Sequence, residues 1–204
     1  MNYFAGRVAL GVFVGVLGFA VTGVFAVDTG IDAIAYRTYV HRDSKTYVRV
    51  PLYWGEKIAE PYRLRPATPS SVLSLDRQDP RISVTIVWSP LDTKRPWSDV
   101  IRAAEDDNLG EEYGLLVAVY GKNKVARPTT LQAGKFTVFK ILLDDGPEGP
   151  AKSAGAVYLF EYANGESRWK IKVRAVYPQI GRDEHIKQIE ELIGQFGIKT
   201  DSEP

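Results

Sequence analysis

The sequence contains no cysteine. This absence excludes disulfide bonds, thiolate metal sites, a cysteine nucleophile and a lipid-modified N-terminal cysteine. The fold must therefore be stabilised by packing, which a chain of 204 residues is long enough to provide.

Histidine is scarce as well, with His41 and His185 as the two examples. A zinc site or a catalytic triad would need one of them to meet carboxylates in space, and no local motif brings that about. We expect both to lie at the surface, beside Arg42 and Glu184 respectively. The sequence therefore predicts no metal site and no catalytic residue.

The chain also lacks a large net charge, because 26 Lys and Arg residues nearly balance 25 Asp and Glu residues. No positive field covers the whole molecule, so nucleic acid is not an expected partner. There is no glycine-rich phosphate loop and no dinucleotide motif. The acidic clusters at residues 105–107 and 144–145 do not have the alternating spacing of a calcium loop. We therefore predict no cofactor.

What the chain does contain is a long uncharged segment, VALGVFVGVLGFAVTGVFAV, at residues 8–27. As a helix rising about 1.5 Å per residue, it would span the roughly 30 Å hydrocarbon core of a bilayer. Arg7 precedes the segment, whereas Asp28 and Asp32 follow it. The positive-inside rule then places the N-terminus in the cytoplasm. We predict an inner-membrane anchor that presents the remaining chain to the periplasm or the cell exterior.

A secretory signal peptide is the alternative interpretation of residues 8–27. Its apolar core usually measures about 7–15 residues, so the length found here favours a retained anchor. Cleavage near Ala26 would instead release a secreted or periplasmic domain, and both interpretations stay open.

Glycine recurs on one face of the expected membrane helix, at Gly11, Gly15 and Gly18. Small residues at this spacing let two membrane helices approach closely. The hypothesis is a homo-dimer through the membrane helix. The alternative is that glycine is simply frequent in apolar export segments.

After this segment we expect a linker at residues 28–35 and one globular domain at residues 36–204. Runs of β-branched and aromatic residues that end in turn residues predict the strands. The predicted strands are residues 36–40, 47–50, 82–88, 113–120, 135–143, 156–162 and 168–176.

Two helices are predicted. The first begins near Ser98, a good N-cap residue, and extends through residues 98–104. The second extends from Asp183 to a stop at Gly197, and its apolar residues recur at a spacing of three and four. We therefore expect an α+β fold: a mainly antiparallel sheet packed by a C-terminal helix and one central helix.

Asn164 and Gly165 separate two strand-like runs and predict a hairpin with a type I′ turn. Such a turn would set Phe160 opposite Trp169. Trp169 and the alternate residues after it would then face the core.

The strand at residues 47–54 (YVRVPLYW), the closing hairpin at residues 158–173 and the final helix resemble the PsbP-like fold. That family also takes in small exported bacterial proteins related to DcrB. Because the family is mostly non-enzymatic, the resemblance implies a binding or assembly module. It implies no particular functional residues.

Four cations alternate along the second strand of the hairpin: Arg168, Lys170, Lys172 and Arg174. Because side chains alternate across a strand, all four share one face. The hypothesis is a binding surface for an anionic lipid, an envelope polymer or an acidic protein. The alternative is a solvated sheet face on which Glu161 pairs with Arg168.

Signatures of catalysis are weak. Asp28-Thr29-Gly30 matches the aspartic protease triplet, but that chemistry needs two aspartates sharing one proton. Ser167 and Lys170 fit an S-x-x-K pattern, yet the serine lies in a predicted strand and not at a helix start. We therefore expect a membrane-tethered, extracytoplasmic binding or assembly module of the cell envelope. An envelope hydrolase acting through Asp28, or a domain that binds anionic lipid or polymer, is the alternative.

Overall fold

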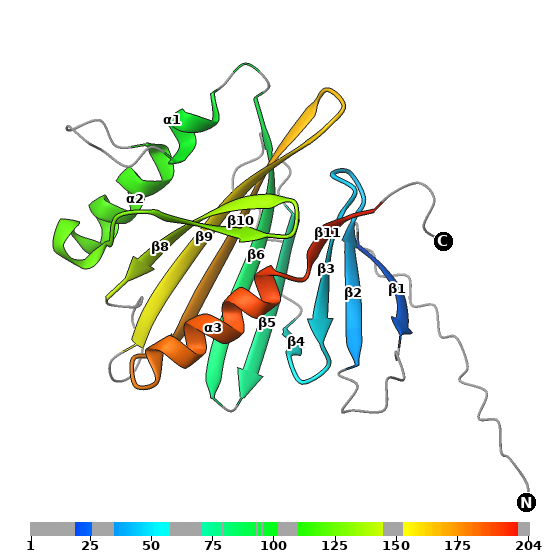
Figure 1. Cartoon of the computed structure of the whole chain (residues 1–204), viewed down its shortest axis with the longest axis horizontal. Coiled ribbons are helices and arrows are strands. Elements are labelled where there is room, and N and C mark those ends of the chain that lie inside the picture. Colours follow the sequence, from blue (N-terminus) through cyan, green and yellow to red (C-terminus); the bar gives the residue numbers. More distant parts are fainter. Residues whose placement is uncertain are drawn as a thin grey trace, which may run out of the picture.

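The computed structural model describes residues 19–25, 35–57, 71–78, 80–92, 94, 96–101, 110–144 and 153–199. Two antiparallel sheets account for the strands in these ranges (Figure 1). The smaller sheet has the order β1-β2-β3-β11. Its strands are β1 (Phe19–Phe25), β2 (Tyr36–His41), β3 (Thr46–Pro51) and β11 (Phe196–Ile198).

The larger sheet has the order β4-β5-β6-β10-β9-β8-β7, so the hairpin of β9 and β10 lies near its centre. This hairpin is where the sequence has its most regular alternation of apolar and polar residues. The strands are β4 (Gly55–Lys57), β5 (Ser71–Gln78), β6 (Arg81–Leu91), β7 (Thr129–Ala133), β8 (Phe136–Leu143), β9 (Ser153–Asn164) and β10 (Ser167–Pro178).

Helix α3 (Arg182–Ile193) lies across one face of the larger sheet, in front of it in Figure 1. Its buried Ile189, Leu192 and Ile193 belong to the main core, which also contains Ile171 and Val173 of β10. Helices α1 (Trp97–Ile101) and α2 (Glu111–Tyr120) belong to the opposite, outer face, where a second apolar cluster forms over β8 and β9. The predicted α+β class, with a C-terminal and a central helix, is confirmed.

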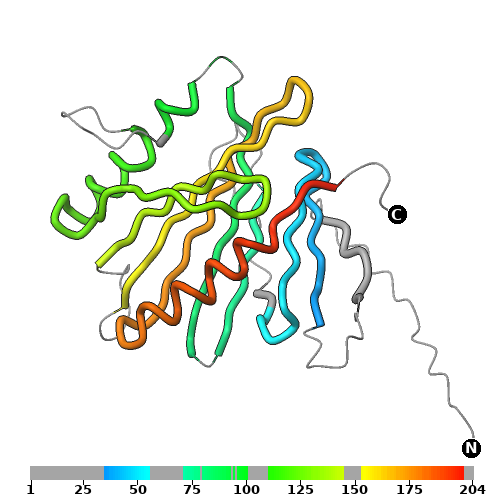
Figure 2. The backbone as a smooth tube through the Cα atoms, in the orientation of Figure 1, coloured from blue at the N-terminus to red at the C-terminus, as the bar shows by residue number. Residues whose placement is uncertain are grey.

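The C-terminal helix ends earlier than the sequence predicted. It stops at Ile193, and residues 196–198 form β11, which pairs with β3 (Figure 2). Gly197 is therefore a strand residue and not the helix stop. A Cβ atom at Gly197 would collide with the ring of Tyr47, so glycine at this position makes room for that ring in its present orientation.

The prediction of a strand at residues 113–120 is wrong, because these residues belong to α2. Valine and tyrosine in the segment suggested a strand. The helix begins with Glu111 and Glu112, whose negative charges suit the positive end of the helix dipole. It buries Tyr113 against the outer apolar cluster. Contacts with distant strands therefore outweigh local β propensity in this segment.

The β9–β10 hairpin forms as predicted, but its register differs by two residues. Phe160 faces Ile171, and Asn164 faces Ser167. Gly165 and Glu166 are thus the central turn residues, and Gly165 has a positive φ of 60°. Glycine at the first central position is typical of a type II′ turn, so Asn164 closes the strand where type I′ was expected. A shift of two residues leaves each side chain on its predicted face.

The predicted membrane helix at residues 8–27 lies largely outside the described residues. Where the structure does describe it, at Phe19–Phe25, the chain forms strand β1 paired with β2, which differs from the expected helix. The valine, threonine and phenylalanine residues of this stretch (FAVTGVF) are compatible with an extended chain. No helix within the described ranges is long and apolar enough to cross a membrane.

Candidate functional site

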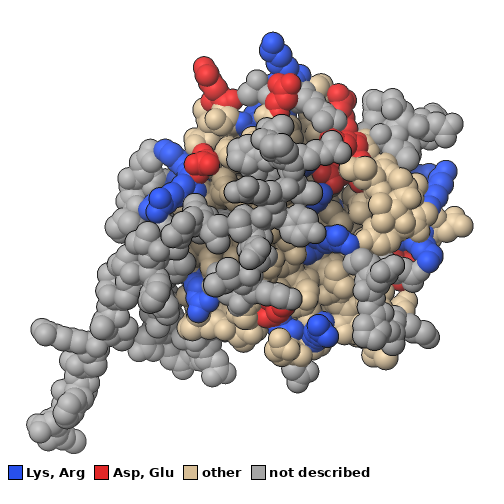
Figure 3. Space-filling model, turned by 180° about the vertical axis from the view of Figure 1, so that it is seen from behind, with Lys and Arg blue, Asp and Glu red and all other residues tan. Residues whose placement is uncertain are grey.

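Strand β10 presents its cations on the outer face of the larger sheet. Trp169, Ile171 and Val173 are buried on the core side, as the alternation predicted. The other side carries a row of four side chains, which we call the cation strip: Arg168, Lys170, Lys172 and Arg174. Figure 3 views the molecule from this side, with lysine and arginine in blue.

Hydroxyl groups lie beside the cation strip on the neighbouring strand. In the register of β10 with β6, Ser89 faces Lys170 and Thr85 faces Arg174. Cross-strand partners share one face of a sheet, so these hydroxyl groups lie next to the cations. The outer face therefore combines positive charge with groups that donate hydrogen bonds to anionic oxygens.

Glu112 of α2 anchors the helix to the centre of the strip. Its Oε1 lies 2.5 Å from Lys170 Nζ, and its Oε2 lies 3.1 Å from Lys172 Nζ. The residue is 4% exposed. Burial raises the pKa of Glu112, but the charges of Lys172 and Lys170 outweigh that effect and hold the pKa below its usual value. Glu112 is therefore an ionised carboxylate shared by two lysines.

Arg174 meets the other end of the same helix. Its Nη2 donates a hydrogen bond of 2.7 Å to the hydroxyl of Tyr120. A hydroxyl group accepts this bond, whereas Lys170 and Lys172 share the single carboxylate of Glu112. Arg174 is also exposed. In the part of the chain that the structure describes, these contacts give the strip more cations than carboxylates, and Arg174 is open to solvent.

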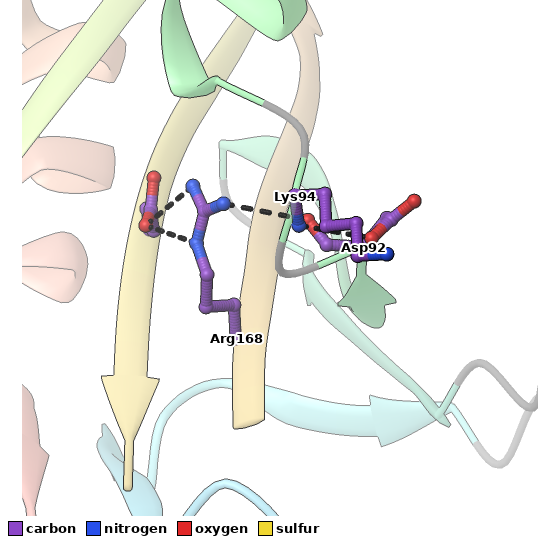
Figure 4. A network of polar contacts seen from close by, with 4 residues as sticks. Asp92, Lys94 and Arg168 are labelled. Atoms are coloured by element: carbon purple, nitrogen blue, oxygen red, sulfur yellow. Dashed lines mark hydrogen bonds and ion pairs between the residues drawn. The ribbon is translucent and has the colours of Figure 1, made fainter. Parts of the chain in front are cut away.

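Arg168, at the far end of the strip, is paired more fully. Its Nε and Nη2 both lie 2.8 Å from Glu161 Oε1, as the alternative interpretation of the sequence expected. Its Nη1 donates to the carbonyl oxygen of Asp92, whose carboxylate accepts from the Lys94 backbone N–H (Figure 4). The hydrogen bond to Glu161 raises the pKa of Arg168. Lys172 and Arg174 are therefore the more suitable residues for binding an anion.

The expectation that both histidines lie at the surface is wrong. His41 is 2% exposed and His185 is 5% exposed. His185 Nδ1 lies 3.1 Å from the carbonyl oxygen of Pro178, which fixes the start of α3 to the end of β10. His41 is covered by Trp88 and Trp169, which are far from it in the sequence, whereas His185 packs against Tyr177, which lies near the end of the preceding strand.

His41 lies in a network of polar side chains between the two sheets. Its ring stacks on Trp88, at 5.3 Å between centroids, and meets the edge of Trp169. Nδ1 lies 2.8 Å from Ser44 Oγ, and Nε2 lies 3.1 Å from Ser71 Oγ. The network then continues from Ser44 to Thr46, which accepts a hydrogen bond from Trp88 Nε1.

The hydrogen bonds also assign the tautomer of His41. The backbone N–H of Ser44 donates to Nδ1, so Nδ1 is an acceptor. The neutral ring therefore carries its hydrogen on Nε2, which donates to Ser71 Oγ. A histidine that donates to a serine is not placed to take the serine's proton. Ser71 and His41 do not form the nucleophile–base pair of a hydrolase.

Burial lowers the pKa of His41 to about 4, against a smaller opposing effect of Asp43. A proton on Nδ1 would also face the backbone N–H of Ser44. The ring is therefore neutral near pH 7, and its role is to join the sheets.

By sequence, the chain matches no protein-family model and no curated protein. By structure, it is similar to the solution structure of cyanobacterial PsbP (CyanoP) from Synechocystis, with a TM-score of 0.53 and 10% identity. The match covers 85% of this chain and 98% of the other. The fold is PsbP-like. This PsbP-like fold confirms the resemblance stated from the sequence.

Two further similarities have lower scores. A protein from Bacteroides thetaiotaomicron gives a TM-score of 0.42 at 11% identity, covering 81% of this chain and 49% of that one. The Ran-binding protein Mog1p from Saccharomyces cerevisiae gives 0.41 at 12% identity, covering 81% and 96%. Scores this low support no argument about this chain.

The sequence predicted the cation strip but missed its partners, Glu112 and Tyr120. The prediction of a strand placed them on the wrong element, although Gly110 followed by two glutamates is typical of a helix start. The other candidate residues, Gly11, Gly15, Gly18 and Asp28, lie outside the described residues. Within the described ranges, no three His, Cys, Asp or Glu side chains are grouped to hold a metal ion.

Proposed function

We propose that this PsbP-like domain is a non-catalytic binding module that holds an anionic partner on the cation strip. The observation that carries the proposal is the unequal charge pairing: Lys170 and Lys172 share the one carboxylate of Glu112, and Arg174 donates to the uncharged hydroxyl of Tyr120. Ser89 and Thr85 add hydroxyl groups beside them. The partner is an anionic lipid, an anionic envelope polymer or the acidic surface of an envelope protein.

The proposed function includes a tether. Residues 8–27 hold the chain in the inner membrane with the N-terminus inside, which requires residues 19–25 to leave their pairing with β2. The domain then works in the periplasm or outside the cell. The support is the uncharged length of the segment together with Arg7 before it and Asp28 after it. Cleavage near Ala26, which would give a freely secreted domain, is the alternative.

The absence of catalysis is supported by the hydrogen-bond directions at His41. Its Nε2 donates to Ser71, and a general base must accept. Lys170 and Lys172 form ion pairs with Glu112, an arrangement that suits electrostatic binding better than proton transfer.

Binding is tested with the full chain in non-ionic detergent and inorganic polyphosphate as a polyanion probe. Replacing both Lys172→Gln and Arg174→Gln should lower the affinity about tenfold, since two half-exposed cations together supply roughly 1.4 kcal/mol. The matched control is the pair Lys135→Gln and Lys187→Gln, which removes two exposed cations elsewhere. Equal affinities for both double variants would contradict the proposed site.

The tether is tested by co-purification from membranes of the chain with and without residues 1–27. The partners recovered should change when the segment is removed. The same partner set from both forms would count against tethering as part of the function.

A further inference from the structure

Helix α2 exposes an apolar face on the side away from the sheet. Leu115 is 55% exposed and Val119 is 72% exposed, and Ala118 between them is exposed too. The opposite side of the helix packs Tyr113, Leu116 and other residues into the outer apolar cluster. Residues at these spacings form one continuous stripe on a helix, so the three exposed side chains make a single surface. We call it the α2 face.

Opposite charges mark the two ends of the α2 face. Glu111 is exposed in the first turn of the helix, and Lys122 is exposed immediately after its end. An acid therefore precedes the apolar side chains along the chain, and a base follows them just beyond Gly121, which ends the helix. These charges complement the helix dipole, whose positive end lies at Glu111.

We infer that the α2 face is the contact between two copies of this chain, related by a two-fold axis. In such a contact the two α2 helices lie antiparallel, and the same patch on each copy meets itself. Glu111 of one copy then lies opposite Lys122 of the second copy, and this pair occurs twice. The apolar residues of both helices meet between the two pairs. An acidic peptide or an anionic bilayer would suit Lys122 but would place Glu111 against like charge.

The contact is independent of the proposed binding site. Arg174 reaches Tyr120 at the sheet side of α2, and Lys172 reaches Glu112 there, whereas Leu115 and Val119 point away from the sheet. A dimer through α2 would therefore present two cation strips at once and allow an anionic partner to be held at two points. The α2 face is small, so we expect weak association of the kind that a shared membrane strengthens by concentrating the copies.

The absence of cysteine provides a direct test, because a single introduced thiol has no competitor. In the full chain, solubilised in non-ionic detergent, Ala118→Cys should give roughly tenfold more disulfide-linked dimer on oxidation than Lys187→Cys, because it lies near the proposed two-fold axis. Lys187 is an exposed residue of α3, on the other face of the larger sheet. Any dimer formed through the membrane segment would raise the yield of both variants equally.

Charge reversal tests the antiparallel arrangement in the Ala118→Cys background. Glu111→Lys alone and Lys122→Glu alone should each lower the yield about two- to tenfold, because each breaks both symmetric pairs. The two reversals together should restore it. Yields equal to those of Lys187→Cys, or a double reversal that fails to restore the yield, would overturn the proposal. Protection of the Ala118→Cys thiol by anionic phospholipid without any crosslinking would assign the face to lipid and would also overturn it.

Discussion

Two buried polar side chains in this molecule, His41 and Glu112, differ in whether they stay charged when removed from water. His41 lies between the two sheets as a neutral ring with hydrogen bonds at both nitrogens and aromatic rings around it. Glu112 lies on the outer face as an ion between two lysines. Removing a group from water disfavours its charged form unless an opposite charge compensates. At His41 burial outweighs the charge of Asp43 and the ring is neutral, whereas at Glu112 the charges of two lysines outweigh burial and the carboxylate stays ionised.

Of the two sites, the one around Glu112 is able to bind a partner. The hydrogen bonds of the network around His41 are directed inward and hold the β2–β3 turn, β5 and β6 together. The lysines around Glu112 are more numerous than their carboxylate, and Lys172 is partly accessible. A neutral, fully bonded network stabilises the fold, whereas an unevenly paired ionic cluster also attracts anions.

The largest expected effect is at the neutral site. His41→Ala should lower the free energy of unfolding by about 3 kcal/mol, because it leaves a cavity beside Trp88 and removes partners from buried hydroxyl groups. Urea unfolding at pH 7 measures the change. A loss below about 1 kcal/mol would show that the two sheets do not depend on this contact.

The second prediction concerns pH and uses the same residue. Unfolded chains protonate histidine near pH 6.5, whereas folded His41 takes up its proton only near pH 4. As the pH falls from 6.5 to 4, the unfolded state binds more protons, so the folded state loses up to about 3 kcal/mol of stability. Unfolding curves across this range should show the slope, and His41→Gln should remove it. An unchanged slope in the variant would contradict the assignment.

A substitution at the charged site should cost less stability and should strengthen the binding of polyphosphate. Glu112→Gln should destabilise the fold by about 2 kcal/mol, because two half-buried lysines lose their countercharge. The same change should strengthen polyphosphate binding, since more positive charge is left for the probe. Unfolding and calorimetric titration of one preparation measure both. Weaker binding in the variant would mean that the strip does not contact the anion.

The pH dependence of stability should also distinguish the two sites. The pKa of Glu112 is lowered, so its contribution to stability is present above the usual glutamate pKa near 4.5 and is lost as the pH falls below that value. The loss that depends on His41 begins at higher pH, near 6.5, and continues to about pH 4. In the Glu112→Gln variant, the part of the profile below pH 4.5 should flatten while the part above it is unchanged.

The smallest effect is expected at Tyr158, which resembles neither site. Its hydroxyl is buried without a hydrogen-bond partner among the described residues, and burial raises its pKa. Tyr158→Phe removes an unsatisfied polar atom and keeps the ring, so stability should stay constant or rise by about 1 kcal/mol. A loss greater than about 1 kcal/mol in thermal or urea unfolding would reveal a partner for this hydroxyl.

The sites differ in how far the sequence predicted them. The cation strip followed from alternation alone, because residues two apart on a strand share a face whatever the strand pairs with. The network around His41 was missed, since its members Ser71 and Trp88 are far from it in the chain. The excess charge on the strip was not predictable either, because it depends on Glu112, which a separate helix brings to the strip.

Periodicity and turn chemistry within a few residues are enough to predict the α+β class, the central hairpin with the two faces of its strands, and the amphipathic C-terminal helix. The turn at Gly165 and Glu166 follows from the pairing register of β9 with β10. The helix at residues 111–120 and the burial of His41 depend on packing against strands distant in sequence. Such contacts change free energy by more than local propensity does.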